Sequence, residues 1–142
     1  MGKEYGHDFT QLSESLTLDS IEYFLFPNAF FFPGLSLPMV YRFRPDPESP
    51  DYCYFDLIFM RPRPSDGKAP DPPEVIHLDV DVSYSTVEGV GPLGRIYDQD
   101  TANLAAQTRG FKSSFKRGQT LGNYQEIRVR HLQNRVRDYL GT

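Results

Sequence analysis

The chain has 142 residues, of which 39% are hydrophobic and 24% are charged, and its formal net charge is -4. This balance predicts one soluble globular unit, or a piece of one, and excludes a disordered chain. No apolar run approaches the roughly 20 residues of a membrane span, and the N-terminus has no signal-peptide core. We therefore expect a cytoplasmic protein without a membrane partner. The single cysteine, Cys53, excludes an internal disulfide.

The first residues are predicted to be a polar lead-in over 1–17, followed by the folded part over 18–142. The lead-in is weakly patterned, and we expect no site there. His7 lies beside Asp8, but a lone histidine near a terminus is typically a solvated side chain rather than a metal ligand.

A series of antiparallel strands is predicted from Ser20 onward, because the apolar side chains alternate with period two. In the first strand both faces are mostly apolar, which indicates a position inside a sheet. Further strands are expected over 29–32, 38–43 and 52–60, with a turn over 45–51.

The stretch 61–74 is rich in proline and is predicted to be an exposed loop rather than a partner-binding peptide. Strand pattern resumes over 75–84, where His77, Asp79 and Asp81 share one face. Three possible ligands on a face suggest a metal site. Opposite a row of aliphatic residues, however, they are more typical of the solvated face of a sheet.

The segment 91–110 is predicted to be a helix that Pro92 begins and Gly110 ends. At about 100° per residue, four apolar side chains share one face: Leu93, Ile96, Tyr97 and Leu104. Asp100 falls in the middle of this face, whereas Asp98 points away from it. The helix is therefore expected to direct one carboxylate inward.

An ionised carboxylate on a core-facing stripe costs several kcal/mol unless it is paired, hydrogen-bonded or bound to a metal. One interpretation of Asp100 is a buried salt bridge to one of the arginines, or a capping hydrogen bond. The other is a metal ligand. The pattern alone leaves both interpretations open.

A second helix is predicted over 123–140, with Asn123 as its cap and Glu126 completing a capping box. Residues 111–142 carry a net charge of +5, against -9 for the first 110 residues. This asymmetry is compatible with nucleic-acid binding, but the basic helix face lacks interleaved aromatic residues. We therefore predict a solvated helix and no nucleic-acid partner.

The motif Asp100-x-x-Asn103, late in such a helix, resembles the carboxylate end of Rieske non-haem iron oxygenases. These are the catalytic alpha subunits of aromatic-ring-hydroxylating dioxygenases. Other stretches resemble the C-terminal catalytic segment of this family in the same order, namely Tyr23-Phe-Leu-Phe-Pro-Asn28, Tyr41-Arg-Phe-Arg44, Asn123-Tyr-Gln-Glu126 and Arg130-His131. The resemblance covers about residues 18 to 141 and favours the metal interpretation of Asp100.

The resemblance implies an α+β fold in which an antiparallel sheet packs on a long C-terminal helix. This is the helix-grip (START/Bet v1-like, SRPBCC) fold, here as an incomplete domain. The family holds mononuclear Fe(II) with two histidines and one carboxylate, for O2-dependent hydroxylation of an aromatic or other apolar substrate. By resemblance, Asp100 is the iron ligand and Asn103 hydrogen-bonds near the ligands. Ile96, Tyr97 and Leu104 are then candidates for the wall of the substrate pocket.

The two iron histidines and the Rieske domain of the family lie upstream of the part that this chain resembles. His77 and His131 do not stand in the family's paired-histidine motif, and one cysteine cannot hold a Rieske 2Fe-2S cluster, which needs two cysteines and two histidines. We expect the chain alone to be inactive, as a truncated gene product, an engineered fragment or one half of a split subunit. The implied partners are the upstream half or other oxygenase subunits, further copies in a homo-oligomer, and an electron-transfer reductase or ferredoxin.

One alternative is a stand-alone helix-grip domain that binds a hydrophobic ligand without catalysis, in a cavity lined by some of the 11 Phe and 9 Tyr residues. An inward carboxylate at Asp100 favours the iron site over this alternative. A third hypothesis is an interaction subunit that pairs with a separate upstream half.

Overall fold

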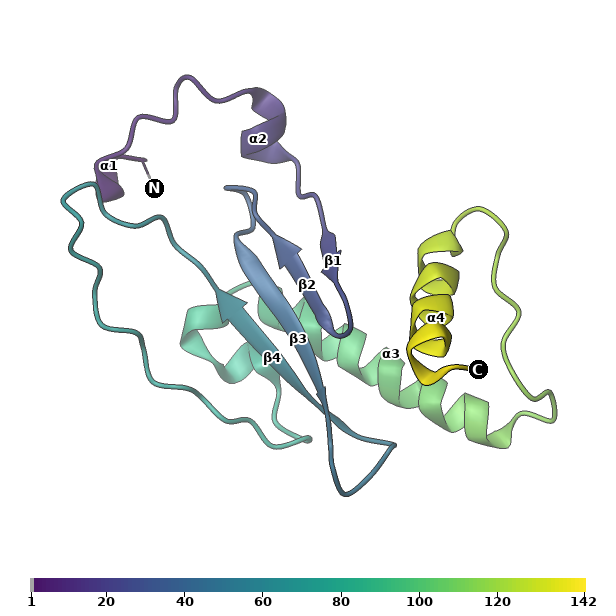
Figure 1. The fold of residues 1–142 in the computed structure, drawn as a ribbon. Helices are drawn as coiled ribbons and strands as arrows, with labels where there is room; N and C mark the ends of the chain where they lie inside the picture. The colour runs from purple at the N-terminus through teal and green to yellow at the C-terminus, as the bar shows by residue number, and fades with distance from the viewer. Residues whose placement is uncertain (1) are drawn as a thin grey trace. The chain divides into compact units, whose positions relative to one another are not determined.

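The computed structural model describes residues 2–142 and shows the α+β fold that the sequence predicts (Figure 1). The strands are β1 (Tyr23–Leu25), β2 (Ala29–Phe32), β3 (Met39–Pro45) and β4 (Cys53–Phe59). The helices are α1 (Gly2–Tyr5), α2 (Glu14–Leu18), α3 (Leu93–Ser113) and α4 (Ile127–Leu140), with short 3-10 helices η1 (Tyr84–Thr86) and η2 (Glu88–Val90). The chain forms two compact units. One contains the described residues through Asp71 together with Leu121–Thr142, and the other is Pro72–Thr120.

The first unit is built on a four-stranded antiparallel sheet in the order β1-β2-β3-β4. Each strand pairs with its neighbour in the sequence, as expected for apolar period-two segments joined by short turns. β3 and β4 form the longest ladder, which runs from Met39 opposite Phe59 to Pro45 opposite Cys53. The predicted strands therefore form, and residues 46–52 connect β3 to β4, close to the predicted turn over 45–51. The first strand was predicted to lie inside the sheet, but β1 lies at its edge.

Aromatic rings cover one face of this sheet. The rings of Phe43 and Phe55 stack across β3 and β4 with centroids 4.6 Å apart, and those of Phe32 and Tyr41 meet edge to face at 4.9 Å. Phe32 and Met39 are buried. Such cross-strand aromatic pairs stabilise the sheet beyond the apolar area that they bury.

The other face of the sheet carries charge. Arg42 and Arg44 on β3 are exposed, and both donate hydrogen bonds to Asp56 on β4. The Arg44 guanidinium also lies over the Tyr54 ring, 5.0 Å from its centroid. This network joins the two longest strands on the side opposite the aromatic rings.

Both ends of the chain contact the first unit. In the segment expected as a polar lead-in, the Tyr5 carbonyl accepts a hydrogen bond from the Ser65 amide (3.0 Å), and the Tyr5 hydroxyl accepts one from Arg61 (3.1 Å). At the other end, Tyr139 of α4 stacks on Phe26 with ring centroids 4.8 Å apart. These contacts lie within one compact unit.

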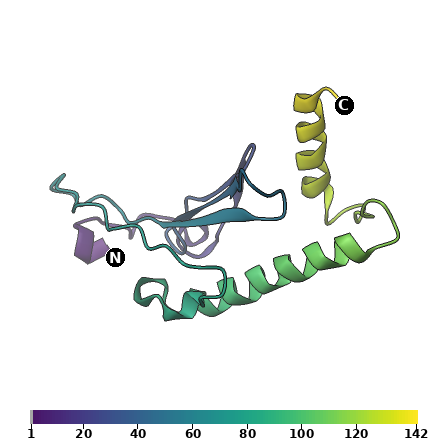
Figure 2. The ribbon, with the colours of Figure 1, turned by 90° about the horizontal axis from the view of Figure 1, so that it is seen from below.

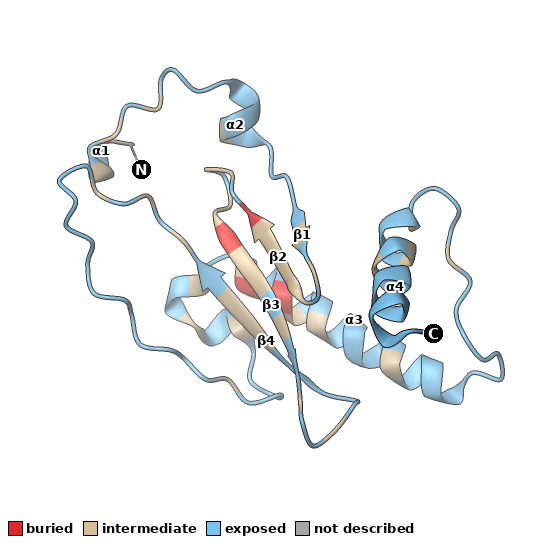
Figure 3. Cartoon of the chain, in the orientation of Figure 1, coloured by how far each residue is buried: buried red, intermediate tan, exposed pale blue. Residues whose placement is uncertain are grey.

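The second unit consists of a coil, η1, η2 and the long helix α3, which runs unbroken for 21 residues (Figure 2). Gly94 and Tyr97 are its buried residues. Figure 3 shows how rare such burial is among the described residues, most of which are half-buried or exposed.

The prediction of a strand over 75–84 is wrong. Residues 75–83 have no regular structure, and Tyr84 begins η1 instead. The alternation of residue types is present, but a strand also needs a neighbouring strand for its amides and carbonyls. The aliphatic side chains consequently remain exposed, including Ile76 at 66% and Val80 at 94%.

The predicted helix ends also need correction. α3 continues through Gly110 to Ser113, because Gly110 adopts no left-handed conformation and nothing there interrupts the helix. α4 begins at Ile127, and its N-cap, Glu126, forms no side-chain cap. The Glu126 carboxylate accepts a hydrogen bond from the Gly122 amide instead of completing a capping box. None of the described helices is long and apolar enough to cross a membrane.

Candidate functional site

The helix α3 carries all of the predicted site residues. Its first turns are fixed by η1, because the Cβ of any side chain at Gly94 would lie 2.7 Å from the Ser85 Cα atom. Glycine is therefore needed at position 94 for the two backbones to approach. Tyr97 packs beside Tyr84, with ring centroids 5.7 Å apart, and is 1% exposed.

Asp98 lies on the packed side of α3, contrary to the sequence prediction. Its carboxylate accepts hydrogen bonds from the hydroxyls of Ser83 and Ser85, each at 2.7 Å, and from the Tyr84 amide at 2.7 Å. The hydrogen bond from Ser83, followed by that from Ser85, holds the pKa of Asp98 below its usual value. This carboxylate joins η1 to α3.

Asp100 is exposed rather than directed into a packed stripe. No side-chain hydrogen bond or ion pair links its carboxylate to another of the described residues. The packed face of α3 contains the buried Gly94 and Tyr97 and the half-buried Asp98, whereas Asp100 lies two residues after Asp98, about 200° round the helix from it. The carboxylate of Asp100 is thus accessible to a ligand from outside the described chain.

Of the four residues predicted to form the site together with Asp100, three lie near it on the exposed side of α3 and one does not. Asn103 is exposed, and Ile96 and Leu104 are 51% and 49% exposed. These three lie one turn or less from Asp100 along α3 and form an uncovered stripe with it. Tyr97 is separated from them, because its ring is buried beside η1.

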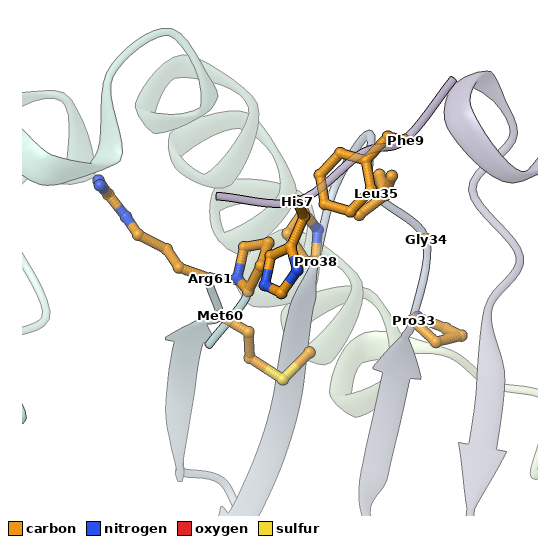
Figure 4. A pocket seen from close by; sticks show the side chains of 9 residues that line it. His7, Phe9, Pro33, Gly34, Leu35, Pro38, Met60 and Arg61 are labelled. Carbon is orange, nitrogen blue, oxygen red and sulfur yellow. The ribbon is translucent and has the colours of Figure 1, made fainter. Parts of the chain in front are cut away.

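One hollow of the described structure lies in the first unit and has a volume of about 280 Å³ (Figure 4). It is lined by His7, Phe9, Pro33, Gly34, Leu35, Pro38, Met60, Arg61 and Pro62. The His7 ring is held by a hydrogen bond between Nε2 and the Arg63 carbonyl oxygen at 2.5 Å. The Arg61 guanidinium points away from the hollow, toward the Tyr5 hydroxyl that it binds. Sequence reasoning missed His7 and Phe9, because the residues that line the hollow with them lie between β2 and β3 and after β4, far away in the sequence.

Another hollow is an apolar groove of about 480 Å³ beside α4. Its lining residues are Phe26, Pro27, Val136, Tyr139 and Leu140. Neither hollow includes the predicted pocket residues of α3.

The described residues do not by themselves fit an iron centre. Nowhere in the described part of the chain do three His, Cys, Asp or Glu side chains gather as metal ligands would. Within the described residues, His77 and His131 belong to no such group. Asp100 can supply one anionic oxygen donor, which is one of the three ligands of a facial triad.

The architecture defines a class: an α+β domain with an antiparallel sheet and a long helix that presents an accessible Asp-x-x-Asn motif. The chain belongs to the family described as the ring hydroxylating alpha subunit (catalytic domain), whose model matches residues 4–142. The predicted family is therefore confirmed, and it is a family of oxygenases that generally depend on iron. No curated protein and no solved structure gives a significant match.

Proposed function

We propose that this chain is the part of a ring-hydroxylating oxygenase catalytic domain that supplies the carboxylate ligand of mononuclear Fe(II). The ligand is Asp100, and the reaction is the O2-dependent hydroxylation of an aromatic or other apolar substrate. The observation that carries the proposal is the family match across residues 4–142, which includes the Asp100-x-x-Asn103 motif.

The geometry of α3 supports this role for Asp100. A ligand carboxylate must be accessible and must be held on a rigid element. Asp100 is exposed in the second turn of a helix whose start is fixed at Gly94 and Asp98. Asn103 is three residues further on, where its amide can donate a hydrogen bond to a ligand oxygen.

Ile96 and Leu104 support the second half of the proposal, the apolar pocket. They lie four residues before and four residues after Asp100, so the carboxylate is flanked by two apolar side chains on one stripe. Both are about half exposed, which leaves them available to contact a substrate. Tyr97 is assigned a packing role at η1, because its ring is already buried.

Two nitrogen ligands would have to come from protein outside the 142 residues. The same holds for a Rieske 2Fe-2S cluster, which the single Cys53 cannot hold. The chain would therefore belong to an assembly with the upstream part of the catalytic subunit, supplied with electrons by a reductase or ferredoxin. Further copies of the subunit are expected, since the family generally forms oligomers.

The test is to co-produce the chain with a polypeptide that carries the family's upstream histidines and Rieske domain. Iron content and substrate-dependent O2 uptake are then measured for the wild type, Asp100→Asn and Asp79→Asn. We expect Asp100→Asn to lower mononuclear iron and turnover by about tenfold or more, because the neutral amide replaces an anionic ligand. Asp79→Asn is the matched control, since Asp79 is an exposed acid of the same unit.

Asp98→Asn is unsuitable as a neutral control, because Asp98 anchors η1. Iron that is retained in Asp100→Asn would refute the metal assignment. If no combination binds iron but the chain binds an apolar probe, the stand-alone binding domain is the better description.

A further inference from the structure

The hollow beside His7 takes one of its walls from the N-terminal segment, where the sequence predicts no site. Figure 4 shows His7 and Phe9, which come from this segment. The other lining residues come from the connection between β2 and β3 and from the residues directly after β4, among them Leu35, Pro38 and Met60. All five are half-buried, so part of each side chain is accessible. No residue of α3 lines the hollow, so it shares none with the proposed iron site.

Hydrogen bonds hold the N-terminal wall of the hollow against the segment that follows β4. The Tyr5 carbonyl accepts a hydrogen bond from the Ser65 amide at 3.0 Å, and the Tyr5 hydroxyl accepts one from Arg61 at 3.1 Å. The His7 ring forms a third, between Nε2 and the Arg63 carbonyl oxygen at 2.5 Å. Because the wall is tied at three points, the hollow is already formed before a ligand binds, which lowers the entropic cost of binding.

The lining of the hollow is mainly apolar and partly rigid. The Phe9 ring stacks on the His7 ring, with centroids 5.8 Å apart, and the Met60 thioether makes the kind of contact that aromatic rings favour. Three lining residues are prolines, which have a fixed φ and no N–H group, namely Pro33, Pro38 and Pro62. A volume of about 280 Å³ is at the small end of ligand pockets, so the lining suits a flat apolar molecule of one or two rings.

His7 supplies a polar group to this apolar lining, and its hydrogen bond decides what the group offers to a ligand. A carbonyl oxygen can only accept, so Nε2 carries the hydrogen in the bond to Arg63. In the neutral ring, Nδ1 is then an acceptor. None of the other described residues forms a hydrogen bond with Nδ1. A ligand that binds to this nitrogen therefore has to be a hydrogen-bond donor.

Arg61 lines the hollow but does not offer its charge to a ligand. Figure 4 shows its guanidinium pointing away from the hollow, where it binds the Tyr5 hydroxyl and lies 3.8 Å from the Glu4 carboxylate. The three prolines have no N–H group to donate either. A carboxylate in the hollow would lose its hydration without gaining a donor, whereas a hydroxyl group can donate to Nδ1 of His7.

We propose that the hollow is a binding site for a small phenol, that is, a molecule of one or two aromatic rings that carries a hydroxyl group. The aromatic ring packs against Phe9, Met60 and the prolines, and the hydroxyl donates a hydrogen bond to Nδ1 of His7. The site is formed by residues of the first unit alone. It therefore does not rest on the role proposed for Asp100.

The first experiment determines the tautomer of His7 in the full chain by long-range ¹H–¹⁵N correlation NMR, at about pH 8, where imidazole is neutral. The chain has three histidines, and the signals that are absent in His7→Gln are those of His7. We expect the Nε2–H tautomer. An Nδ1–H tautomer, or signals averaged between the two, would overturn the proposal, because no acceptor would then be held at the hollow.

The second experiment compares three probes by equilibrium dialysis against the full chain at the same pH. 2-Naphthol can donate a hydrogen bond, 2-methoxynaphthalene has the same rings and oxygen but cannot donate, and 2-naphthoate is an anion. We expect one molecule of 2-naphthol per chain, bound about fivefold more tightly than the methyl ether, as one hydrogen bond predicts. 2-Naphthoate should bind more weakly than both. Equal affinity for 2-naphthol and its methyl ether, a preference for 2-naphthoate, or no binding would each overturn the proposal.

His7→Phe keeps an aromatic ring at the hollow and removes the acceptor. The roughly fivefold preference for 2-naphthol over its methyl ether should disappear in this variant. His77→Phe is the matched control, because His77 is an exposed histidine of the second unit and its loss should leave the preference unchanged. Circular dichroism verifies that each variant is folded. A preference that persists in His7→Phe would overturn the proposal.

Phe9→Ala tests the ring contact separately from the hydrogen bond. It should weaken 2-naphthol and its methyl ether by a similar factor, about fivefold or more, and leave the preference between them unchanged. Tyr139→Ala is the matched control, because Tyr139 lines the apolar groove beside α4 instead. Weaker binding in Tyr139→Ala but not in Phe9→Ala would overturn the proposal in favour of that groove. Asp100→Asn should bind 2-naphthol like the wild type, so this test and the test of the iron ligand can fail separately.

Discussion

Asp56 is the residue whose ionisation is most strongly tied to the fold of the sheet. Its carboxylate accepts hydrogen bonds from Arg42 at 2.7 Å and from Arg44 at 2.8 and 3.0 Å. The hydrogen bonds from Arg44 are the main cause that lowers the pKa of Asp56 to about 2. The arginine side chains are each 48% exposed, so solvent screens part of this interaction.

We predict that Asp56→Asn lowers the free energy of unfolding by about 1 kcal/mol at neutral pH. The folded-state pKa lies below the unfolded value of about 3.9. The stabilisation is therefore present above that value and is lost as the pH falls through about 2. Urea denaturation, followed by near-UV circular dichroism, measures the difference at neutral and acidic pH.

Glu22→Gln, at an exposed position beside β1, is the control for the loss of one negative charge. A difference between wild type and Asp56→Asn that persists undiminished near pH 2 would contradict the role of the ionised carboxylate.

Asp98 acts in the same way at the junction of η1 and α3. Because hydrogen bonds from Ser83 and Ser85 lower its pKa, its contribution is present at neutral pH and is lost as the pH falls below the usual carboxyl range. We predict that Asp98→Ala increases hydrogen exchange at the Tyr84 amide, which loses its acceptor. Asp79→Ala should leave this exchange rate unchanged, and equal effects of both variants would contradict the anchoring role.

At the scale of elements, two glycines within α3 differ in the space around them. A Cβ at Gly94 would lie 2.7 and 2.8 Å from the Ser85 Cα and N atoms, which are backbone atoms. A Cβ at Gly110 would meet nothing within 4 Å. The helix is thus locked to η1 at its start and free of such contacts near its end.

We predict that Gly94→Ala destabilises the second unit by about 1–3 kcal/mol, because the backbone of η1 must move away. Gly110→Ala should stabilise α3 by about 0.5–1 kcal/mol, since alanine is the better helix former. Thermal unfolding followed by far-UV circular dichroism compares the two variants. Stabilisation by both substitutions would show that η1 is not held against α3.

At the scale of the whole molecule, the chain carries one proposed iron ligand and many uncovered apolar side chains. Phe32, Met39 and Tyr97 are the hydrophobic residues that are buried among those described. In the proposed assembly, the protein that supplies the two further iron ligands would also cover some of these exposed apolar side chains.

We predict that the isolated 142-residue chain binds Fe(II) weakly or not at all. One carboxylate does not replace the two nitrogen ligands of the facial triad, and no group of three ligands forms among the described residues. Anaerobic titration calorimetry measures the affinity and the stoichiometry. Tight binding of one iron per chain would mean that His77 or His131 takes part after all.

The sequence alone determined the family, the α+β class and the positions of the four strands. The motif at Asp100 and Asn103 is a local pattern, and so is the alternation of residues in β1 to β4, so both can be read from neighbours in the chain. The continuation of α3 past Gly110 was missed, because a glycine ends a helix only when the backbone turns left-handed there.

Only the tertiary structure decided which side of α3 is packed. Apolar residues occur on both sides of the helix, and their periodicity predicted that Asp100 faces inward. In the structure η1 packs on the other side, where it donates three hydrogen bonds to Asp98. It also decided that residues 75–83 form no strand, since a strand depends on a partner that can be distant in the sequence. In both cases the outcome depends on long-range contacts, which local residue patterns do not contain.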